Sequence, residues 1–332
     1  MHKLSVGVDW QGSLDRERMY DNVRAADESG VHSVWVAEAW GRDAFSILTL
    51  LADRTKNIQL GTGIVNIFSR SPGALAQHFT TLDEISNGRM IIGLGTSGAQ
   101  VIEHFHGVPF QRGLRRLREY VEIINMLVAG EPLNYEGEIY NLKRGFTLRF
   151  DTVRKHIPIY LATLNPASVR QTARIADGWI PIWTPIEKVD EEIKLLRETA
   201  AKAGRDPESI TVRSPGGITI TQNLDRAKAG VAGGLAFYVS RMGVFYYEHV
   251  SRLGYADEAA AIKRAWDEGG SQAGIAAVPE HLQQQMGFVT DSVDAARERL
   301  AEQEAAGINL HAVSVDAETP QERAKIYEQL VS

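Results

Sequence analysis

Short apolar runs alternate along the chain with longer segments in which apolar residues recur every three or four positions. The short runs are rich in Ile, Val and Leu and predict strands buried on both faces, whereas the longer spacing predicts amphipathic helices. The predicted strands are residues 4–10, 31–37, 58–65, 90–94, 157–162, 179–183, 210–220 and 309–315. The predicted helices are residues 15–29, 44–52, 72–86, 114–128, 167–176, 189–203, 226–239 and 292–306, and a last helix from 321.

Two segments interrupt this alternation. Residues 131–156 begin with EPLNYEGEIYNLKRGFTLRF, in which apolar and polar residues alternate around Gly137, and this pattern predicts a hairpin. Residues from 243 to about 287 have helical spacing without a strand, which makes 243–290 a second insertion. We therefore expect one domain over 1–332 that carries two insertions.

Strands and helices in alternation indicate a closed parallel barrel, the TIM (β/α)8 barrel, with the insertions after its fourth and seventh strands. A doubly wound open sheet is the alternative. It is less favoured because the turn after the first strand, DWQGSLD, has one glycine and lacks the GxGxxG fingerprint of dinucleotide-binding sheets. Active sites of such barrels lie at the carboxyl ends of the strands. The candidate residues are therefore those that directly follow each strand.

Composition narrows the class of protein and of ligand. The 332 residues are 44% hydrophobic and 23% charged, which is typical of a globular protein with a large core. The net charge of −6 argues against a nucleic-acid partner, which would require a clustered basic surface. No window approaches the roughly 20 apolar residues of a membrane span, and MHKLSVGVDW lacks the pattern of a signal peptide. We expect a cytoplasmic protein with a small-molecule substrate.

Two carboxylates follow neighbouring strands. Asp9 ends the first predicted strand and Glu38 the second, so both are expected at the same mouth of the barrel. One carboxyl in a partly apolar site can have a raised pKa and donate a proton while its neighbour stays ionised. The structural alternative is that these residues cap the following segment or pair with Arg42. The coincidence of the two positions favours Asp9 and Glu38 as catalytic residues.

Small polar residues and glycines after two other strands suit an anionic group. Gly95, Thr96, Ser97 and Gly98 form a loop that can offer amide hydrogens and hydroxyls, and the segment from Asn165 to Ser168 begins a helix whose N-terminus attracts anions. Glycine after a strand is also ordinary turn chemistry. Because both features lie on the expected catalytic side, they predict a site for the phosphate of a cofactor.

Other chemistries have weaker signals. The side chains of His104 and His106 lie close to Glu103 in the sequence, but their alternate spacing does not place two ligands on one helix face, and we predict no metal site. The run RGLRRLREY could hold an anionic tail, although such runs are usually solvated. No GxSxG elbow supports serine hydrolysis.

Several motifs together resemble the luciferase-like flavin and deazaflavin oxidoreductases, and most of all the methylene-tetrahydromethanopterin reductases and their actinobacterial relatives. The resemblance covers nearly the whole chain. Its most specific parts are IQLGTGIVNIFSRSP and TLDEISNGRMIIGLGTSG, accompanied by VWVAEAWGRD, REYVEIINMLVAGEPLNYEGEIYNL and IPIYLATLNPASVRQTARIADGW.

This resemblance implies a TIM barrel that holds a flavin or deazaflavin ring at the carboxyl ends of the strands. A non-prolyl cis peptide bond in the third strand, which corresponds here to Gly63-Ile64, would form a bulge against the ring. Asp9 matches the carboxylate that the reductases are proposed to use as a proton donor. The remaining positions carried over to the cofactor site are Asn66, Arg70, Thr163, Asn165, Ala167 and Ser168.

One departure concerns the residues after the second strand. Many deazaflavin dehydrogenases of the family have an acidic residue followed by histidine, whereas Glu38 is followed here by Ala39 and Trp40. The missing imidazole argues against alcohol or sugar dehydrogenation. Together with Trp10 and Trp183, Trp40 could line an aromatic substrate pocket.

The leading hypothesis is a coenzyme F420-dependent oxidoreductase that transfers a hydride between the deazaflavin and a small organic substrate, in the manner of a methylene-tetrahydropterin or folate reductase. An FMN-dependent monooxygenase is the main alternative. A non-catalytic flavin-binding protein and direct use of a nicotinamide donor are further alternatives. A homodimer is implied by the resemblance alone.

Overall fold

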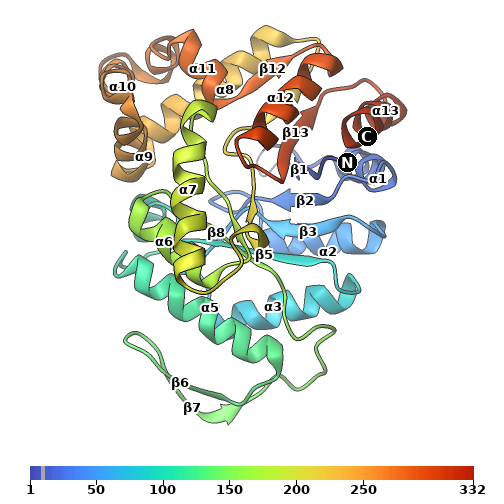
Figure 1. The fold of residues 1–332 in the computed structure, drawn as a ribbon, viewed down its shortest axis with the longest axis vertical. Helices are drawn as coiled ribbons and strands as arrows, with labels where there is room; N and C mark the ends of the chain where they lie inside the picture. Colours follow the sequence, from blue (N-terminus) through green and yellow to red (C-terminus); the bar gives the residue numbers. More distant parts are fainter. Residues whose placement is uncertain (9–11) are drawn as a thin grey trace.

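Parallel strands form the centre of the protein, and helices cover them on the outside (Figure 1). A computed structural model describes residues 1–8 and 12–332. Neighbouring strands of the large sheet follow the order β10-β9-β8-β5-β3-β2-β1-β13-β11-β12, and the short strand β4 also pairs with β5. The strands are β1 (Leu4–Val8), β2 (Ser33–Val36), β3 (Gln59–Thr62), β4 (Val65–Asn66), β5 (Met90–Gly95), β8 (Ile159–Ala162), β9 (Gly178–Trp179), β10 (Thr211–Val212), β11 (Ile218–Ile220), β12 (Phe288–Thr290) and β13 (His311–Val315).

The sheet curls until β10, at one end of the strand order, reaches β13. A parallel bridge between Arg213 and Leu310 joins the chain just after β10 to the chain just before β13. The first strand, β1, pairs with β2 on one side and with β13 on the other, so the beginning and the end of the chain meet in the same wall. The predicted TIM barrel is thereby confirmed.

Polar caps start the helices at the positions that the sequence indicates. The side chains of Asp15, Asp43, Ser71, Asn165 and Thr319 each accept a hydrogen bond from a backbone N–H of the following first turn, which satisfies a group that the helix itself leaves unpaired. The main helices are α1 (Arg16–Glu28), α2 (Ala44–Arg54), α3 (Pro72–Ile85), α5 (Gly113–Ala129), α6 (Pro166–Ile175), α7 (Ile186–Lys202), α8 (Leu224–Arg241), α12 (Val293–Ala305) and α13 (Pro320–Val331). These bounds agree with the predicted helices to within a few residues.

Both insertions are present where the sequence places them. The first is an antiparallel hairpin of β6 (Leu133–Glu136) and β7 (Asn141–Phe146), as predicted. The second contains α9 (Val244–Val250), a π-helical turn (Ser251–Tyr255), α10 (Ala256–Ala276) and α11 (Glu280–Met286). The hairpin and the α10–α11 region lie at opposite ends of the molecule (Figure 1).

Several details differ from the predicted elements. The strand predicted at 210–220 divides into β10 and β11, because Pro215 has no N–H to pair and Gly216 lies against the backbone of the second insertion. A Cβ at Gly216 would be 2.1 Å from the carbonyl oxygen of Met286. The strand predicted at 58–65 divides into β3 and β4. The short helix α4 (Ala99–His104) and the strand β12 were not predicted.

Large aromatic rings fill the barrel interior, and glycines make room for them. Trp35 and Tyr160 are buried there with ring centroids 5.6 Å apart. A Cβ at Gly61 would lie 2.8 Å from Trp35, and a Cβ at Gly178 would lie 2.5 Å from Tyr160. The barrel centre is therefore solid, and any ligand must bind at one of its rims. Across the described residues, no helix is long and apolar enough to cross a membrane.

Candidate functional site

A cavity of about 850 Å³ opens at the carboxyl ends of the strands, the rim where barrels of this kind place their active sites. Its volume is within the usual range for small-molecule sites. Of the residues predicted from the sequence, those that line the cavity are Glu38, Gly63, Ile64, Gly95, Thr96, Ser97, Thr163, Asn165 and Ser168. Asp9 and Trp10 lie outside the described residues. Trp40 also lines the cavity, whereas Trp183 lies beside it, against Tyr238.

One wall of the cavity is made largely of backbone. The peptide bond Gly63-Ile64 is cis, as the resemblance implies, and both residues face the cavity. Beside them, a Cβ at Gly95 would lie 3.1 Å from Ile64 Cδ1 and 3.4 Å from Ala162 Cβ. A side chain at this position would press on both neighbours, so glycine keeps this part of the wall compact. A flat ring can approach such a wall closely.

Two non-glycine residues at the strand ends have positive φ angles. Ser97, after β5, has φ of 60°, and Trp183, after β9, has φ of 52°. A bulky residue in this region is uncommon, and such conformations gather at ligand sites. The indole Nε1 of Trp183 is also buried without a hydrogen-bond partner among the described residues. Both features indicate a site built for a ligand.

The start of α6 forms another part of the cavity. Asn165 caps the helix by accepting a hydrogen bond from the N–H of Ser168 at 3.0 Å, while the Thr163 hydroxyl lies 2.9 Å from that of Thr172. Ala167 belongs to the first turn but is not a lining residue. Gly98 is not a lining residue either, because it lies against the residue that ends α8, where a Cβ would be 2.9 Å from Met242 O.

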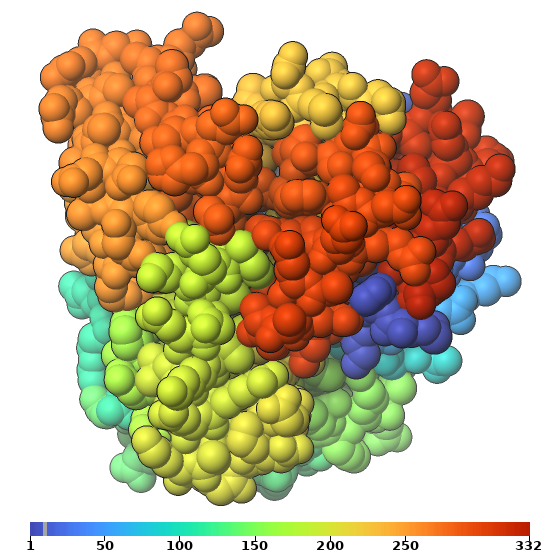
Figure 2. Space-filling view, turned by 45° about the horizontal axis from the view of Figure 1, so that its top comes forward, coloured from blue at the N-terminus to red at the C-terminus, as the bar shows by residue number. Residues whose placement is uncertain are grey.

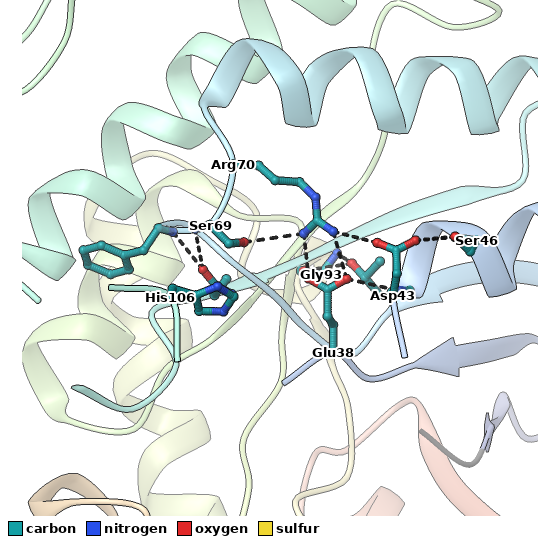
Figure 3. A network of polar contacts seen from close by, with 11 residues as sticks. Glu38, Asp43, Ser46, Ser69, Arg70, Gly93 and His106 are labelled. Atoms are coloured by element: carbon teal, nitrogen blue, oxygen red, sulfur yellow. Dashed lines mark hydrogen bonds and ion pairs between the residues drawn. The ribbon is translucent and has the colours of Figure 1, made fainter. Parts of the chain in front are cut away.

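Glu38 belongs to a network of charges behind the cavity wall (Figure 3). Both of its oxygens accept hydrogen bonds from the guanidinium of Arg70, at 2.6 and 3.1 Å, and one also accepts from the N–H of Ala44 at 3.0 Å. Arg70 donates in addition to Asp43 at 2.6 Å. Burial raises the pKa of Asp43, but the hydrogen bonds from Ser46 and the charge of Arg70 outweigh it, so that the pKa is lowered overall.

This arrangement fixes Glu38 in place. A carboxylate whose two oxygens already accept hydrogen bonds from a cation and a helix N-terminus is poorly suited to donate a proton. The geometry instead makes Glu38 a positioning residue that ties β2 to α2 and to Arg70. Asn66 is likewise occupied, since its side-chain oxygen accepts from the N–H groups of Phe68 and Ser69. Neither Asn66 nor Arg70 lines the cavity.

Arg70→Met is expected to lower the free energy of unfolding by about 2 kcal/mol, because it leaves the nearly buried Glu38 beside Asp43 without their shared cation. Urea unfolding measures the change. The matched control is Arg118→Met, which breaks an exposed i,i+4 pair with Glu122 and should cost less than about 0.5 kcal/mol. Equal stability of the Arg70 and Arg118 variants would contradict the structural role of this network.

A face of α8 that the sequence analysis missed forms the opposite wall of the cavity. The residues on it are Gly230, Gly233, Gly234, Phe237 and Tyr238. Their spacing of three and four places them on one side of the helix. Small residues at the start of this face keep the cavity wide, and aromatic residues follow near its far end. The spacing of these residues indicates one helix face. The rule that functional residues follow the strands does not include a helix face, so it does not find them.

The glycines of this face lower the stability of helix α8. Substitution of one of them should therefore raise the stability of the fold, and a large side chain should in addition weaken ligand binding. A Cβ at Gly230 would meet no atom within 4 Å, and we expect Gly230→Ala to raise the free energy of unfolding by about 0.5 to 1 kcal/mol. Gly230→Phe should fill part of the cavity and weaken ligand binding without loss of stability. Urea unfolding and ligand titration of both variants test this. Unchanged affinity in Gly230→Phe would show that ligands do not use this part of the cavity.

Polar groups from the second insertion complete the rim. Glu248 and Arg252 line the cavity. Arg252 donates to Nδ1 of the buried His249 at 2.8 Å and to Glu192 at 3.2 Å, and His249 Nε2 lies 3.1 Å from the Thr184 hydroxyl. Burial and the charge of Arg252 lower the pKa of His249 to about 4. Burial also raises the pKa of Glu192, although Arg252 opposes this. A neutral imidazole thus holds Arg252 at the rim.

The lowered pKa of His249 makes stability depend on pH. The unfolded chain binds more protons than the folded one between pH 6.5 and about 4, so the free energy of unfolding should fall as the pH falls through this window. The loss expected from this residue is about 3 kcal/mol. Urea unfolding should show a shallower fall in His249→Gln and an unchanged fall in His104→Gln, where the histidine is exposed. The same slope in both variants would contradict this origin.

The arginines of RGLRRLREY have partners within the chain. Arg112 and Arg115 pair with Glu138, and Arg118 pairs with Glu122. The guanidinium of Arg116 lies over the ring of Phe68, 4.9 Å from its centroid. These contacts support a structural role for the run.

Comparison with known proteins agrees with the barrel fold. The family model described as luciferase-like monooxygenase matches residues 6–310. The chain belongs to this family. Its homologues are oxidoreductases, and so the protein is an oxidoreductase enzyme.

Members of the family that resemble the chain are described with different activities. A Mycobacterium tuberculosis protein described as a putative coenzyme F420-dependent oxidoreductase is 31% identical and covers 94% of both chains. The 5,10-methylenetetrahydromethanopterin reductase of Archaeoglobus fulgidus is 27% identical over 71% of this chain and 70% of its own length. The structure of the F420-dependent tetrahydromethanopterin reductase from Methanopyrus kandleri has a TM-score of 0.79, with 22% identity and coverage of 99% and 97%.

Proposed function

We propose that the protein is a coenzyme F420-dependent oxidoreductase that transfers a hydride between the deazaflavin and a small organic substrate. The observation that carries the proposal is the rim cavity with a backbone wall at Gly63, Ile64 and Gly95. The full-length relative described as F420-dependent supports this choice of cofactor. When bound, F420 supplies a carbon centre that accepts or gives up a hydride.

The residues of the cavity fit such a cofactor. Gly95 keeps the backbone wall compact, and the glycine face of α8 leaves a wide slot for a ring system. Thr96 and Ser97 bring hydroxyl groups to one end of the slot, and Ser168 and Asn165 bring the start of α6, where a helix N-terminus favours negative charge. In this proposal, Ser97 and Ser168 contact the phosphate side of the cofactor. The backbone wall orients the ring.

The substrate that we propose is a heterocyclic molecule with a carbon–nitrogen group that can open to an iminium, in the class of methylene-tetrahydropterins or folates. The outer cavity is lined by Trp40, Phe237, Tyr238, Phe245 and Tyr246, and aromatic faces bind flat rings by offset or edge contacts. The name of the Archaeoglobus reductase supports the same class. Glu248 and Arg252 would read polar groups at its edge.

Proton transfer requires a carboxyl group that is not already paired. Glu38 is held by Arg70 and Ala44, so we propose that Asp9, the residue that follows β1 in the sequence, donates the proton. Glu38 positions α2 and Arg70 beside the cavity. This division replaces the expectation that both carboxylates act in the chemistry.

Anaerobic turnover tests the proposal. Reduced F420 should be oxidised when methylene-tetrahydropterin or methylene-tetrahydrofolate is added to the purified protein, and the absorbance of oxidised F420 should return. Reduced FMN with oxygen is the comparison for the alternative function, an FMN-dependent monooxygenase. Substrate-dependent oxygen consumption with FMN, without turnover of F420, would overturn the proposal in favour of that alternative.

The resemblance also underlies two proposals about the state of the protein. We propose that it acts as a homodimer in the cytoplasm. Sedimentation equilibrium of the untagged chain measures the mass in solution, and fractionation of the producing cells measures the compartment. A monomer at micromolar concentration would contradict the first proposal.

A further inference from the structure

Two histidines and a glutamate meet at the rim of the barrel that lies opposite the cavity. His2 precedes β1, Glu304 lies near the end of α12, and His311 begins β13. The backbone N–H of His311 donates to the carbonyl of Lys3, so the first and last strands meet directly at this point. Figure 2 shows the N-terminal residues, in dark blue, against the orange-red C-terminal part at the surface.

The three side chains present their polar atoms to one another. His2 Nδ1 lies 2.7 Å from Glu304 Oε1, and His311 Nε2 lies 3.7 Å from the same oxygen. The ligand atoms of all three residues lie within 4.8 Å of one another, and this is the one such group of three among the described residues. The two imidazole rings are perpendicular, with centroids 6.0 Å apart. The two rings therefore approach the space between the three ligand atoms in different orientations.

The buried member of the group has an unused nitrogen. His311 has no exposed surface, and its Nε2 has no hydrogen-bond partner among the described residues. Its Nδ1 lies 2.8 Å from the side-chain oxygen of Gln303, which accepts, so the proton is on Nδ1. The lone pair of Nε2 then faces the Glu304 carboxylate. Two groups with only lone pairs to offer lie 3.7 Å apart, which is unfavourable unless a proton or a metal ion lies between them.

We propose that His2, Glu304 and His311 bind a divalent transition metal ion, with Zn²⁺ the best match, at the seam between the first and last strands. Two imidazole nitrogens and one carboxylate oxygen form a donor set that Zn²⁺ accepts, with water as the fourth ligand. The hydrogen bond from His311 Nδ1 to Gln303 fixes the tautomer in the way usual for a metal-bound histidine.

The geometry needs only small movements to close around a metal. Ligand atoms about 2.0 to 2.1 Å from zinc stand roughly 3.3 Å apart in a tetrahedron, between the two distances observed. His311 is rigidly held by the core, whereas the side chains of His2 and Glu304 are 21% and 47% exposed and can adjust.

The role of the ion would be structural. The site joins residues about 300 positions apart in sequence, and none of its three residues is among the described residues that line the cavity. A metal here would hold the segment before β1 against α12 and β13. Because it binds the folded state and not the dispersed ligands of the unfolded chain, it should stabilise the fold in proportion to its occupancy.

The test uses untagged full-length protein that has been treated with a chelator and then titrated with ZnCl₂. Calorimetry should show one zinc ion per chain at micromolar affinity, and the Tm should rise by roughly 4 °C at a hundredfold excess over Kd. Glu304→Gln and His2→Gln should each weaken zinc binding at least tenfold and reduce the Tm shift at the same zinc concentration to half or less. His281→Gln, which breaks an exposed His–Glu pair at 3.7 Å that lacks a third ligand, should bind zinc as the wild type does.

Two results would overturn the proposal. One is the absence of stoichiometric zinc in the wild-type protein, and the other is zinc binding that Glu304→Gln and His2→Gln leave unchanged. Both variants alter partly exposed side chains, so that folding is retained; His311→Gln, at a buried position, is not needed. X-ray absorption at the zinc edge provides an independent readout, since it should show two imidazoles in the coordination shell.

Discussion

Gly93→Ala is expected to lower the free energy of unfolding by about 4 kcal/mol and to weaken cofactor binding at least tenfold. A Cβ at this position would lie 1.7 Å from the carbonyl oxygen of Thr62. It would also break two hydrogen bonds between Thr62 and Gly93. The Thr62 hydroxyl donates to Gly93 O at 2.8 Å and accepts from Gly93 N at 2.9 Å. Forced displacement of a packed strand costs about 1 to 3 kcal/mol or more, and each lost hydrogen bond about 1 kcal/mol.

The binding effect follows from the position of Gly93 in the barrel. It joins β3 to β5 just before Gly63 and Gly95, the residues of the backbone wall. Displacement of either strand would move that wall. The matched control is Gly7→Ala in β1, where a Cβ would meet no atom of the described residues within 4 Å and the change should stay within about 0.5 kcal/mol. Similar unfolding curves for the two variants would contradict the close approach of β3 to β5.

Asp9→Asn is expected to lower kcat for a proton-requiring reduction by roughly 10²-fold while leaving cofactor affinity unchanged. The amide keeps the size of the side chain but cannot supply the proton. Steady-state turnover of reduced F420 under anaerobic conditions measures the effect, and fluorescence titration measures cofactor binding. Asp53→Asn, at an exposed position, is the control and should retain full activity.

Two outcomes separate the possible roles of Asp9. Unchanged turnover in Asp9→Asn would remove Asp9 from the mechanism. The next candidate would then be Glu248, which lines the cavity, as Glu38 does. Loss of cofactor affinity together with kcat would instead give Asp9 a binding role. Only a selective fall in kcat supports proton donation.

Much of the fold could be predicted from the sequence because local signals and the tertiary structure agree. Capping residues such as Ser71 and Asn165 start helices where the apolar period begins. Short runs of Val, Ile and Leu mark the strands, and their alternation with helices specifies a barrel. The break between β10 and β11 was missed because it depends on Met286, which is about 70 residues away from Gly216.

The candidate site was predicted in part, for a similar reason. Residues directly after strands, such as Glu38, Gly95 and Thr163, line the cavity because the barrel brings all carboxyl ends to one rim. What Glu38 does there depends on Arg70, which lies 32 positions later in the sequence, and no local pattern reports that pairing. The α8 face could be predicted from the sequence if helix faces were searched as well as strand ends, since its glycines and aromatic residues repeat at helical spacing.

The group of His2, Glu304 and His311 lies beyond any sequence pattern. Metal-ligating residues are usually recognised by short spacings, and these three come from both ends of the chain. Only closure of the barrel between β1 and β13 brings them together.

The most direct test of the account is an anaerobic titration of the untagged protein with F420 and, separately, with FMN, followed by the fluorescence of each cofactor. We expect one F420 to bind per chain at micromolar concentration and FMN not to compete with it. Gly93→Ala should weaken the binding of F420, whereas Gly7→Ala should not. Tight stoichiometric binding of FMN, with no binding of F420, would contradict it.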